Sequence, residues 1–165
     1  MELTIYRGYH ENMKIKSSFI IAVLIPIAVG TLSALISGNM SIYNGIDKPP
    51  LAPPGFLFPI VWTILYILMG ISSYIVYQSD SAYKTNALQT YVLQLFFNFL
   101  WSIIFFRLDL YLLAFIWLLV LILLIIKMIR QFCKIEPIAA YLQIPYLLWC
   151  IFAAYLNFMI FLSSI

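Results

Sequence analysis

The sequence predicts an all-α fold, an integral membrane bundle of five transmembrane helices, and three observations carry this prediction. Hydrophobic residues make up 65% of the 165 residues. Charged residues make up only 9%, whereas a soluble domain carries about 25% to cover its surface. Five stretches without a single acidic or basic residue approach the roughly 20 residues of a membrane-crossing helix. The solvent of this chain is therefore lipid.

The five predicted spans follow one another with mostly short polar gaps. The first contains Pro26 in its interior and is too long for a signal-peptide core, so we expect a retained, kinked helix. The fourth continues as a helix to Arg130, whose charged end can reach the membrane interface. Short gaps after the second, third and fourth spans make successive helices antiparallel neighbours. The spans are residues 17–37, 56–78, 85–106, 110–126 and 137–165, in one domain, 14–165, that follows a polar tail, 1–13.

Only the gap at 38–55 is long, and it ends in a proline-rich run. The segment KPPLAPPG (48–55) holds four prolines between two apolar spans. Proline fixes its own φ and biases the preceding residue toward extended geometry. Loops longer than about 12–15 residues in compact domains are usually functional or disordered, and the prolines argue against disorder. We therefore expect a stiff loop that acts as a lid at one mouth of the bundle.

The basic residues are distributed unevenly between the two membrane sides. With five spans, the N-terminus and the gaps after the second and fourth spans share one side, which holds seven of the nine basic residues. The positive-inside rule therefore predicts a cytoplasmic N-terminus, with the first loop and the C-terminus outside. This topology explains the net charge of +3, so no nucleic-acid partner is expected.

Ionisable and metal-binding chemistry is sparse. No charged side chain lies in the middle of a span, which argues against an ion pump or a proton-coupled transporter. Cys133 and Cys150 are isolated and His10 lies in the tail, so we expect no metal and no cofactor. Trp117 sits among leucines and is expected to face lipid or to pack. Small residues in the first span favour close helix packing over a dimer face. They are Gly30, Ser33, Ala34 and Ser37.

Aromatic and uncharged polar residues gather on one face of three predicted helices. Amides and hydroxyls in hydrocarbon need partners inside the protein, so these faces should point toward the bundle interior. A cavity lined in this way suits a flat, apolar ligand with polar edges. Alternatively, the amides only hydrogen-bond across helices and the tryptophans form interfacial belts. The faces comprise Trp62, Tyr66, Met69 and Ser73, then Gln94, Asn98, Trp101, Ser102 and Phe105, then Gln143, Tyr146, Trp149, Ala153, Leu156 and Asn157.

Three blocks carry a family resemblance: KPPLAPPGFLFPIVWTILYILMG (48–70), QLFFNFLWSIIFF (94–106) and PYLLWCIFAAYLNFMIF (145–161). In this order and spacing they resemble the TspO family of tryptophan-rich sensory proteins and mitochondrial translocator proteins, formerly called peripheral benzodiazepine receptors. The resemblance implies a five-helix fold, usually dimeric, with a ligand cavity that the first loop closes over. Family ligands include porphyrins such as protoporphyrin IX, isoquinoline carboxamides and benzodiazepine-type drugs, and cholesterol in animal members.

Carried over by position, the resemblance also implies pocket residues and shows two departures. Leu51 stands where the family commonly has Trp, which removes a stacking surface and an indole donor from the loop. Nothing basic follows Tyr155, so the cholesterol-type pattern is incomplete and cholesterol is not expected. The implied pocket residues are Tyr43, Pro53, Phe58, Trp62, Tyr66, Ser102, Phe105, Trp149, Ala153 and Leu156.

These expectations combine into a membrane receptor or translocator that binds porphyrins and benzodiazepine- or isoquinoline-type ligands under the proline-rich loop. Its expected partners are such a flat apolar molecule, membrane lipid and a second copy in a homodimer, in a bacterial cell membrane. The alternative is light- and oxygen-dependent porphyrin degradation, known for similar bacterial proteins, with Trp62 and Trp149 as the reacting indoles. A third hypothesis is a structural or regulatory subunit with an incidental cavity. No acid–base pair, nucleophile–base pair or metal cluster indicates a conventional enzyme.

Overall fold

The computed structural model of this chain describes the backbone of residues 2–38 and 51–165, and the side chains of 17–38 and 51–165. Within these residues the fold is all-α, as predicted, and five segments are long and apolar enough to cross a membrane. The helices are α1 (Glu2–Ser37), α3 (Leu57–Gln78), α4 (Lys84–Phe106), α5 (Tyr111–Cys133), α6 (Pro137–Tyr141) and α7 (Ile144–Ser163).

The observed helices differ from the predicted spans in two places. α5 continues past Arg130 to Cys133, which extends the predicted fourth helix by nearly one turn. The last span is divided into α6 and α7 and is not one continuous helix. Pro145 explains the division, because proline has no N–H for the bond to residue 141 and its ring crowds that residue's carbonyl. α6 accordingly ends at Tyr141.

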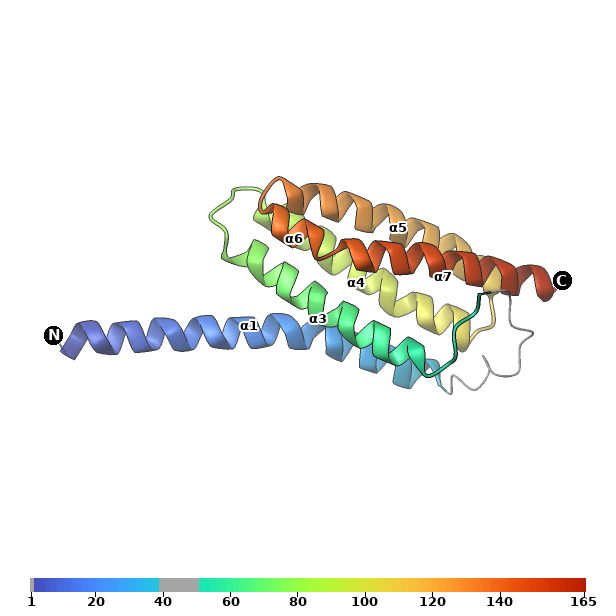
Figure 1. The fold of residues 1–165 in the computed structure, drawn as a ribbon, viewed down its shortest axis with the longest axis horizontal. Helices are drawn as coiled ribbons and strands as arrows, with labels where there is room; N and C mark the ends of the chain where they lie inside the picture. Colours follow the sequence, from blue (N-terminus) through green and yellow to red (C-terminus); the bar gives the residue numbers. More distant parts are fainter. Residues whose placement is uncertain (1, 39–50) are drawn as a thin grey trace.

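Four helices form an elongated antiparallel bundle, and α1 lies along one side of it (Figure 1). α1 packs on α3 and α4, while α5 packs on α4, α6 and α7. The two termini lie at opposite ends of the long axis, as expected for an odd number of spans (Figure 1). Among the described residues, the side of α3 and α4 that faces away from α5 is therefore covered by α1 alone.

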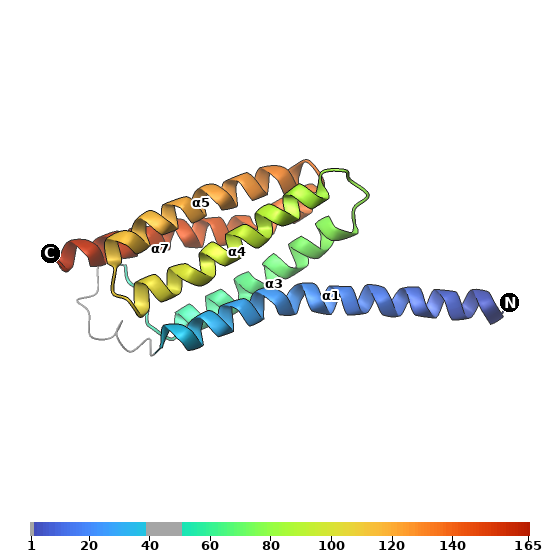
Figure 2. The same cartoon turned by 180° about the vertical axis from the view of Figure 1, so that it is seen from behind.

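α1 is longer than the predicted span, since the helix already begins at Glu2 in the segment that the sequence assigned to a polar tail. Its N-terminal part extends beyond the rest of the bundle, and its direction changes in the C-terminal half (Figures 1 and 2). Pro26 lies inside this half, which agrees with the predicted kink.

Close contacts fix α1 against the bundle. A Cβ atom on Gly70 would lie 2.5 Å from the Cα of Val23, so only glycine allows this approach of α3 to α1. The Ser33 hydroxyl donates to the carbonyl of Phe99 on α4 at 2.7 Å. Ser33 thus serves helix packing, the interpretation that the sequence favoured for the small residues of the first span.

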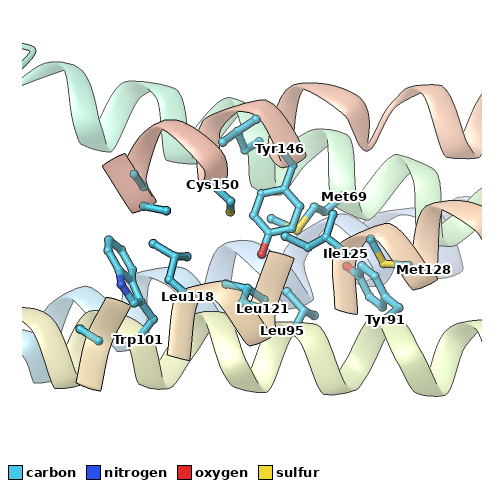
Figure 3. Close-up of a cluster of buried hydrophobic side chains, with 14 of the residues drawn as sticks. Met69, Tyr91, Leu95, Trp101, Leu118, Leu121, Ile125, Met128, Tyr146 and Cys150 are labelled. Carbon is cyan, nitrogen blue, oxygen red and sulfur yellow. The ribbon is translucent and has the colours of Figure 1, made fainter. Parts of the chain in front are cut away.

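A dry core fills the space between α4, α5 and α7 (Figure 3). Leu118, Leu121, Ile125 and Met128 come from one face of α5 and are at most 1% exposed. The opposite face of α5 carries exposed leucines such as Leu123, which is 65% exposed. α5 therefore separates the core from the lipid.

Candidate ligand-binding site

Trp62 on α3 is the central member of a cluster of four aromatic rings from three helices. The other three rings surround it. Its ring stacks on Tyr66, with centroids 5.5 Å apart and an interplanar angle of 29°. Trp101 on α4 lies 6.3 Å away at 35°, and Tyr146 on α7 lies 6.2 Å away edge-on. The rings offer flat apolar surface of the kind that aromatic and other planar ligands stack upon.

A cavity of about 210 Å³ adjoins this cluster between α1, α3 and α4. The side chains that line it include indoles, hydroxyls and an amide but, among the described residues, no charged group. The lining comprises Ile27, Gly30, Thr31, Ser33, Ala34, Phe58, Pro59, Trp62, Thr63, Tyr66, Asn98, Trp101, Ser102 and Phe106.

Four of the site residues implied by the family resemblance share this lining. Three of them, Phe58, Trp62 and Tyr66, lie on one face of α3, and Ser102 lies opposite on α4. The others lie elsewhere: Phe105, Ala153 and Leu156 are buried in the core, Trp149 and Pro53 are half-buried outside the described lining, and Tyr43 lies outside the described residues.

A chain of hydrogen bonds crosses the bundle beside the cavity. The Tyr66 hydroxyl donates to Asn98 Oδ1 at 2.8 Å, and Asn98 Nδ2 donates to the Tyr146 hydroxyl at 3.2 Å. Tyr146 in turn donates to Gln94 Oε1 at 2.8 Å, and Gln94 Nε2 lies 3.7 Å from the Met69 sulfur. Gln94 and Asn98 are 0% and 3% exposed, which confirms that these amides face the interior. This hydrogen-bond chain joins α3, α4 and α7, whose backbones make few close contacts with one another.

Trp101 and Trp149 differ in how they are held. Trp101 Nε1 donates to Asn157 Oδ1 at 3.3 Å, and Asn157 Nδ2 donates to the carbonyl of Tyr111. Trp149 packs edge-on against Phe58 at 5.8 Å. Its buried Nε1 has no hydrogen-bond partner within the part of the chain that the structure describes. Trp149 thus has a free donor next to Phe58, which lines the cavity.

Trp117 lies apart from this cluster, on the far side of α4. Its ring stacks on Phe97 with centroids 4.4 Å apart, and its Nε1 donates to the carbonyl of Phe97 at 2.9 Å. The packing role expected for Trp117 is confirmed.

The wall that α1 contributes to the cavity was not predicted from the sequence. Gly30 is the clearest case, because a Cβ atom there would lie 2.0 Å from Tyr66 Cε2. This glycine makes room for the Tyr66 ring and not for another helix backbone. The signal was present in the small residues at helical spacing, but spacing alone does not reveal whether they admit a helix or a side chain.

Leu51 is the first residue of the proline-rich segment that the structure describes. This residue has a φ of 71° and is 82% exposed, whereas the following Ala52 packs against the core. A left-handed backbone conformation is unusual for any residue with a large side chain, leucine included. Leu51 therefore makes little contact with the rest of the described chain.

Comparison with known proteins assigns the chain to a family. The model of the TspO/MBR family matches residues 22–162. The chain is a member of the TspO/MBR family. The Tryptophan-rich protein TspO of Archaeoglobus fulgidus is 34% identical over 148 residues, which cover 87% of this chain and 94% of that protein. The Tryptophan-rich sensory protein of Cereibacter sphaeroides is 34% identical over 131 residues, covering 79% and 81%.

Animal proteins of the TspO/MBR family are similar too. The Translocator protein of Ovis aries is 33% identical over 119 residues, which cover 70% of each chain. Membership in this family and five membrane-spanning helices make this an integral membrane protein and support a translocator or receptor role. The match includes α3, α4 and α7, the three helices that hold the aromatic cluster.

Proposed function

We propose that this protein is a membrane receptor or translocator for a porphyrin of the protoporphyrin IX type, with benzodiazepine- and isoquinoline-type molecules as further ligands. The observation that carries the proposal is the position of Trp62, between the rings of Tyr66, Trp101 and Tyr146 and beside a cavity. A flat ligand that enters there meets aromatic faces and, at its edge, the Tyr66 and Ser102 hydroxyls.

Binding requires aromatic side chains to move. The cavity of about 210 Å³ is smaller than the roughly 300–1,000 Å³ of pockets for drug-sized ligands. Trp101 is held by its bond to Asn157, whereas Trp62 makes ring contacts without a hydrogen bond to any described residue. Trp62 is therefore the ring that a porphyrin displaces first.

The orientation and assembly belong to this proposal as well. Described basic residues at the α3–α4 and α5–α6 turns include Lys84 and Lys134, and the opposite end has Arg107. The positive-inside rule then favours a cytoplasmic N-terminus, with the first loop and C-terminus outside a bacterial cell membrane. The protein would act as a homodimer.

The decisive experiment is a titration of the detergent-purified protein with protoporphyrin IX, followed by Soret absorbance and tryptophan quenching. Trp62→Leu is expected to weaken binding at least tenfold, because it removes the central stacking surface. Trp117→Leu is the matched control and should bind like wild type, since Trp117 packs on Phe97 outside the cavity. Equal affinities of the two variants, or no binding by wild type, would refute the proposal.

A second candidate function is porphyrin degradation driven by light and oxygen. It is favoured by two indoles near the cavity, since Trp62 lines it and Trp149 packs on Phe58, which also lines it. Illumination of porphyrin complexes in air tests it. Loss of photobleaching in both Trp62→Phe and Trp149→Phe, with binding retained, would support degradation. Bleaching at the rate of free porphyrin in wild type and both variants would leave a binding protein.

A further inference from the structure

A second and larger hollow lies on the outer surface between α1 and α4. These two helices diverge toward the N-terminal end of α1 (Figure 2). The groove between these two helices has a volume of about 650 Å³ and is floored by Ser73 of α3 and by Tyr91 and Leu95 of α4. Its walls are lipid-exposed, as Ile21, at 57%, and Val92, at 62%, illustrate. No residue in the described part of the chain lines both this groove and the cavity beside Trp62.

The groove continues to the membrane interface. A neighbouring depression of about 720 Å³ shares four lining residues with it and reaches the first turn of α4. The shared residues are Tyr77, Leu88, Val92 and Phe96. From Lys84 to Phe99 the α4 side of this path is 15 residues long, or about 22 Å at 1.5 Å per residue. This exceeds the roughly 15 Å depth of one hydrocarbon leaflet, so the path can hold an acyl chain from headgroup to bilayer centre.

A fixed positive charge stands at the interfacial end. The Lys84 ammonium donates to the carbonyl of Ser79 at 2.8 Å and to that of Tyr77 at 3.4 Å, and it lies 6.0 Å from the centre of the Tyr77 ring. Both acceptors are neutral carbonyls, so these bonds define the position of the ammonium without pairing it with an acidic group. Thr85 and Gln89 add a hydroxyl and an amide to the same end.

We propose that this groove binds an anionic phospholipid from the leaflet on the N-terminal side. One acyl chain lies along the path from Leu88 past Val92 to Phe99, and the phosphate pairs with Lys84 and Thr85. Charge complementarity argues for this occupant, because basic groups at the interfacial end of a groove between membrane helices attract anionic headgroups. A zwitterionic lipid fits the apolar path equally well but gains less from the ammonium.

Native mass spectrometry of the full chain in detergent tests the proposal with two added lipids, dioleoyl phosphatidylglycerol and dioleoyl phosphatidylcholine. Wild type is expected to retain the anionic lipid preferentially. Lys84→Gln should weaken phosphatidylglycerol binding about fivefold, the equivalent of one lysine near the surface, and leave phosphatidylcholine unchanged. Lys127→Gln is the matched control, since Lys127 is an exposed lysine near the same end of the bundle on α5, away from the groove.

A second pair of variants tests the path of the acyl chain. Val92→Trp fills the groove from an exposed position and should reduce binding of both lipids, whereas Leu123→Trp on α5 should not. Each variant is also sized by light scattering. The proposal is overturned if wild type shows no preference for phosphatidylglycerol, or if the two lysine variants bind alike. It is also overturned if Val92→Trp changes the oligomeric state and not lipid binding, because the groove would then be an interface between two copies.

Discussion

The two sides of α4 differ in what fills them. On the α5 side, aliphatic and methionine side chains such as Leu121 and Met128 pack to 0% exposure. On the α1 side, aromatic rings, amides and small residues leave a cavity of about 210 Å³ and an outer groove of about 650 Å³. The first arrangement resists rearrangement, whereas the second has room for side chains to move. We infer that stability and ligand binding are divided between the two sides of one helix.

The largest effect is expected from a cavity in the dry core. Leu121→Ala should lower the free energy of unfolding in detergent by about 2–5 kcal/mol, because the packed neighbours cannot close the space. Porphyrin affinity of the folded protein should stay within about twofold of wild type. Thermal melting and Soret titration measure both. Leu123→Ala, on the lipid-facing side of α5, is the control and should change little. A large loss of affinity in Leu121→Ala would show that the two sides are not separate.

On the α1 side of α4, a substitution is expected to lower porphyrin affinity as well as stability. Gly30→Ala places a methyl group against Tyr66, so the ring must shift and its bond to Asn98 is lost. Porphyrin affinity should fall at least fivefold, and overpacking should cost about 1–3 kcal/mol of stability. The double variant Gly30→Ala/Tyr66→Leu removes the clash and should regain much of that stability. A double variant no more stable than Gly30→Ala would indicate that the methyl group clashes with the α3 backbone instead.

The loop tip offers a smaller test of the ligand side. Leu51→Trp restores the aromatic residue common in the family, and stacking on a bound porphyrin should tighten binding by about tenfold at most. Leucine and tryptophan are equally strained at a φ of 71°, so the substitution should not change the conformational free energy of the backbone at this position. Competitive titration against wild type measures the gain. Unchanged or weaker binding would place the loop tip away from the ligand.

The smallest effect concerns the hydrogen-bond chain that lies between the two sides. Asn98→Leu removes the partner of Tyr66 and should lower stability by about 1 kcal/mol, seen as a lower melting temperature in detergent. Gln143→Leu provides the contrast. Gln143 is 0% exposed, and neither of its amide atoms has a partner among the described residues, so its replacement should be neutral or stabilising. Equal melting temperatures of wild type and Asn98→Leu would show that the hydrogen bonds of Asn98 do not stabilise the protein.

Much of this architecture could be predicted because membrane helices obey two simple rules. Span length and charge depletion located the five spans, and the helical period placed Trp62, Gln94 and Tyr146 on interior faces. The division at Pro145 follows from the same sequence, but span length and charge depletion alone predict a single helix over 137–165. The hydrogen bonds between particular side chains could not be predicted, since they depend on the distances between helices.

The size of the cavity was equally out of reach of sequence patterns. Rings that line a wall can also fill the space in front of it, and the side-chain conformations of Trp62 and Trp101 decide which of the two occurs. The contribution of Gly30 was hidden for a related reason. A glycine has no side chain whose chemistry would indicate which residue packs against it.

α1 is the common wall of two hollows, with Gly30 and Ser33 facing the inner cavity and Ala22 and Val29 facing the outer groove. Any change in its tilt alters both volumes at once. If a ligand in one hollow changes this tilt, its binding is thermodynamically linked to binding in the other hollow, and the proposed lipid and porphyrin then change each other's affinity by the same factor. An affinity measured in one detergent therefore describes this protein together with whatever fills the groove in that detergent.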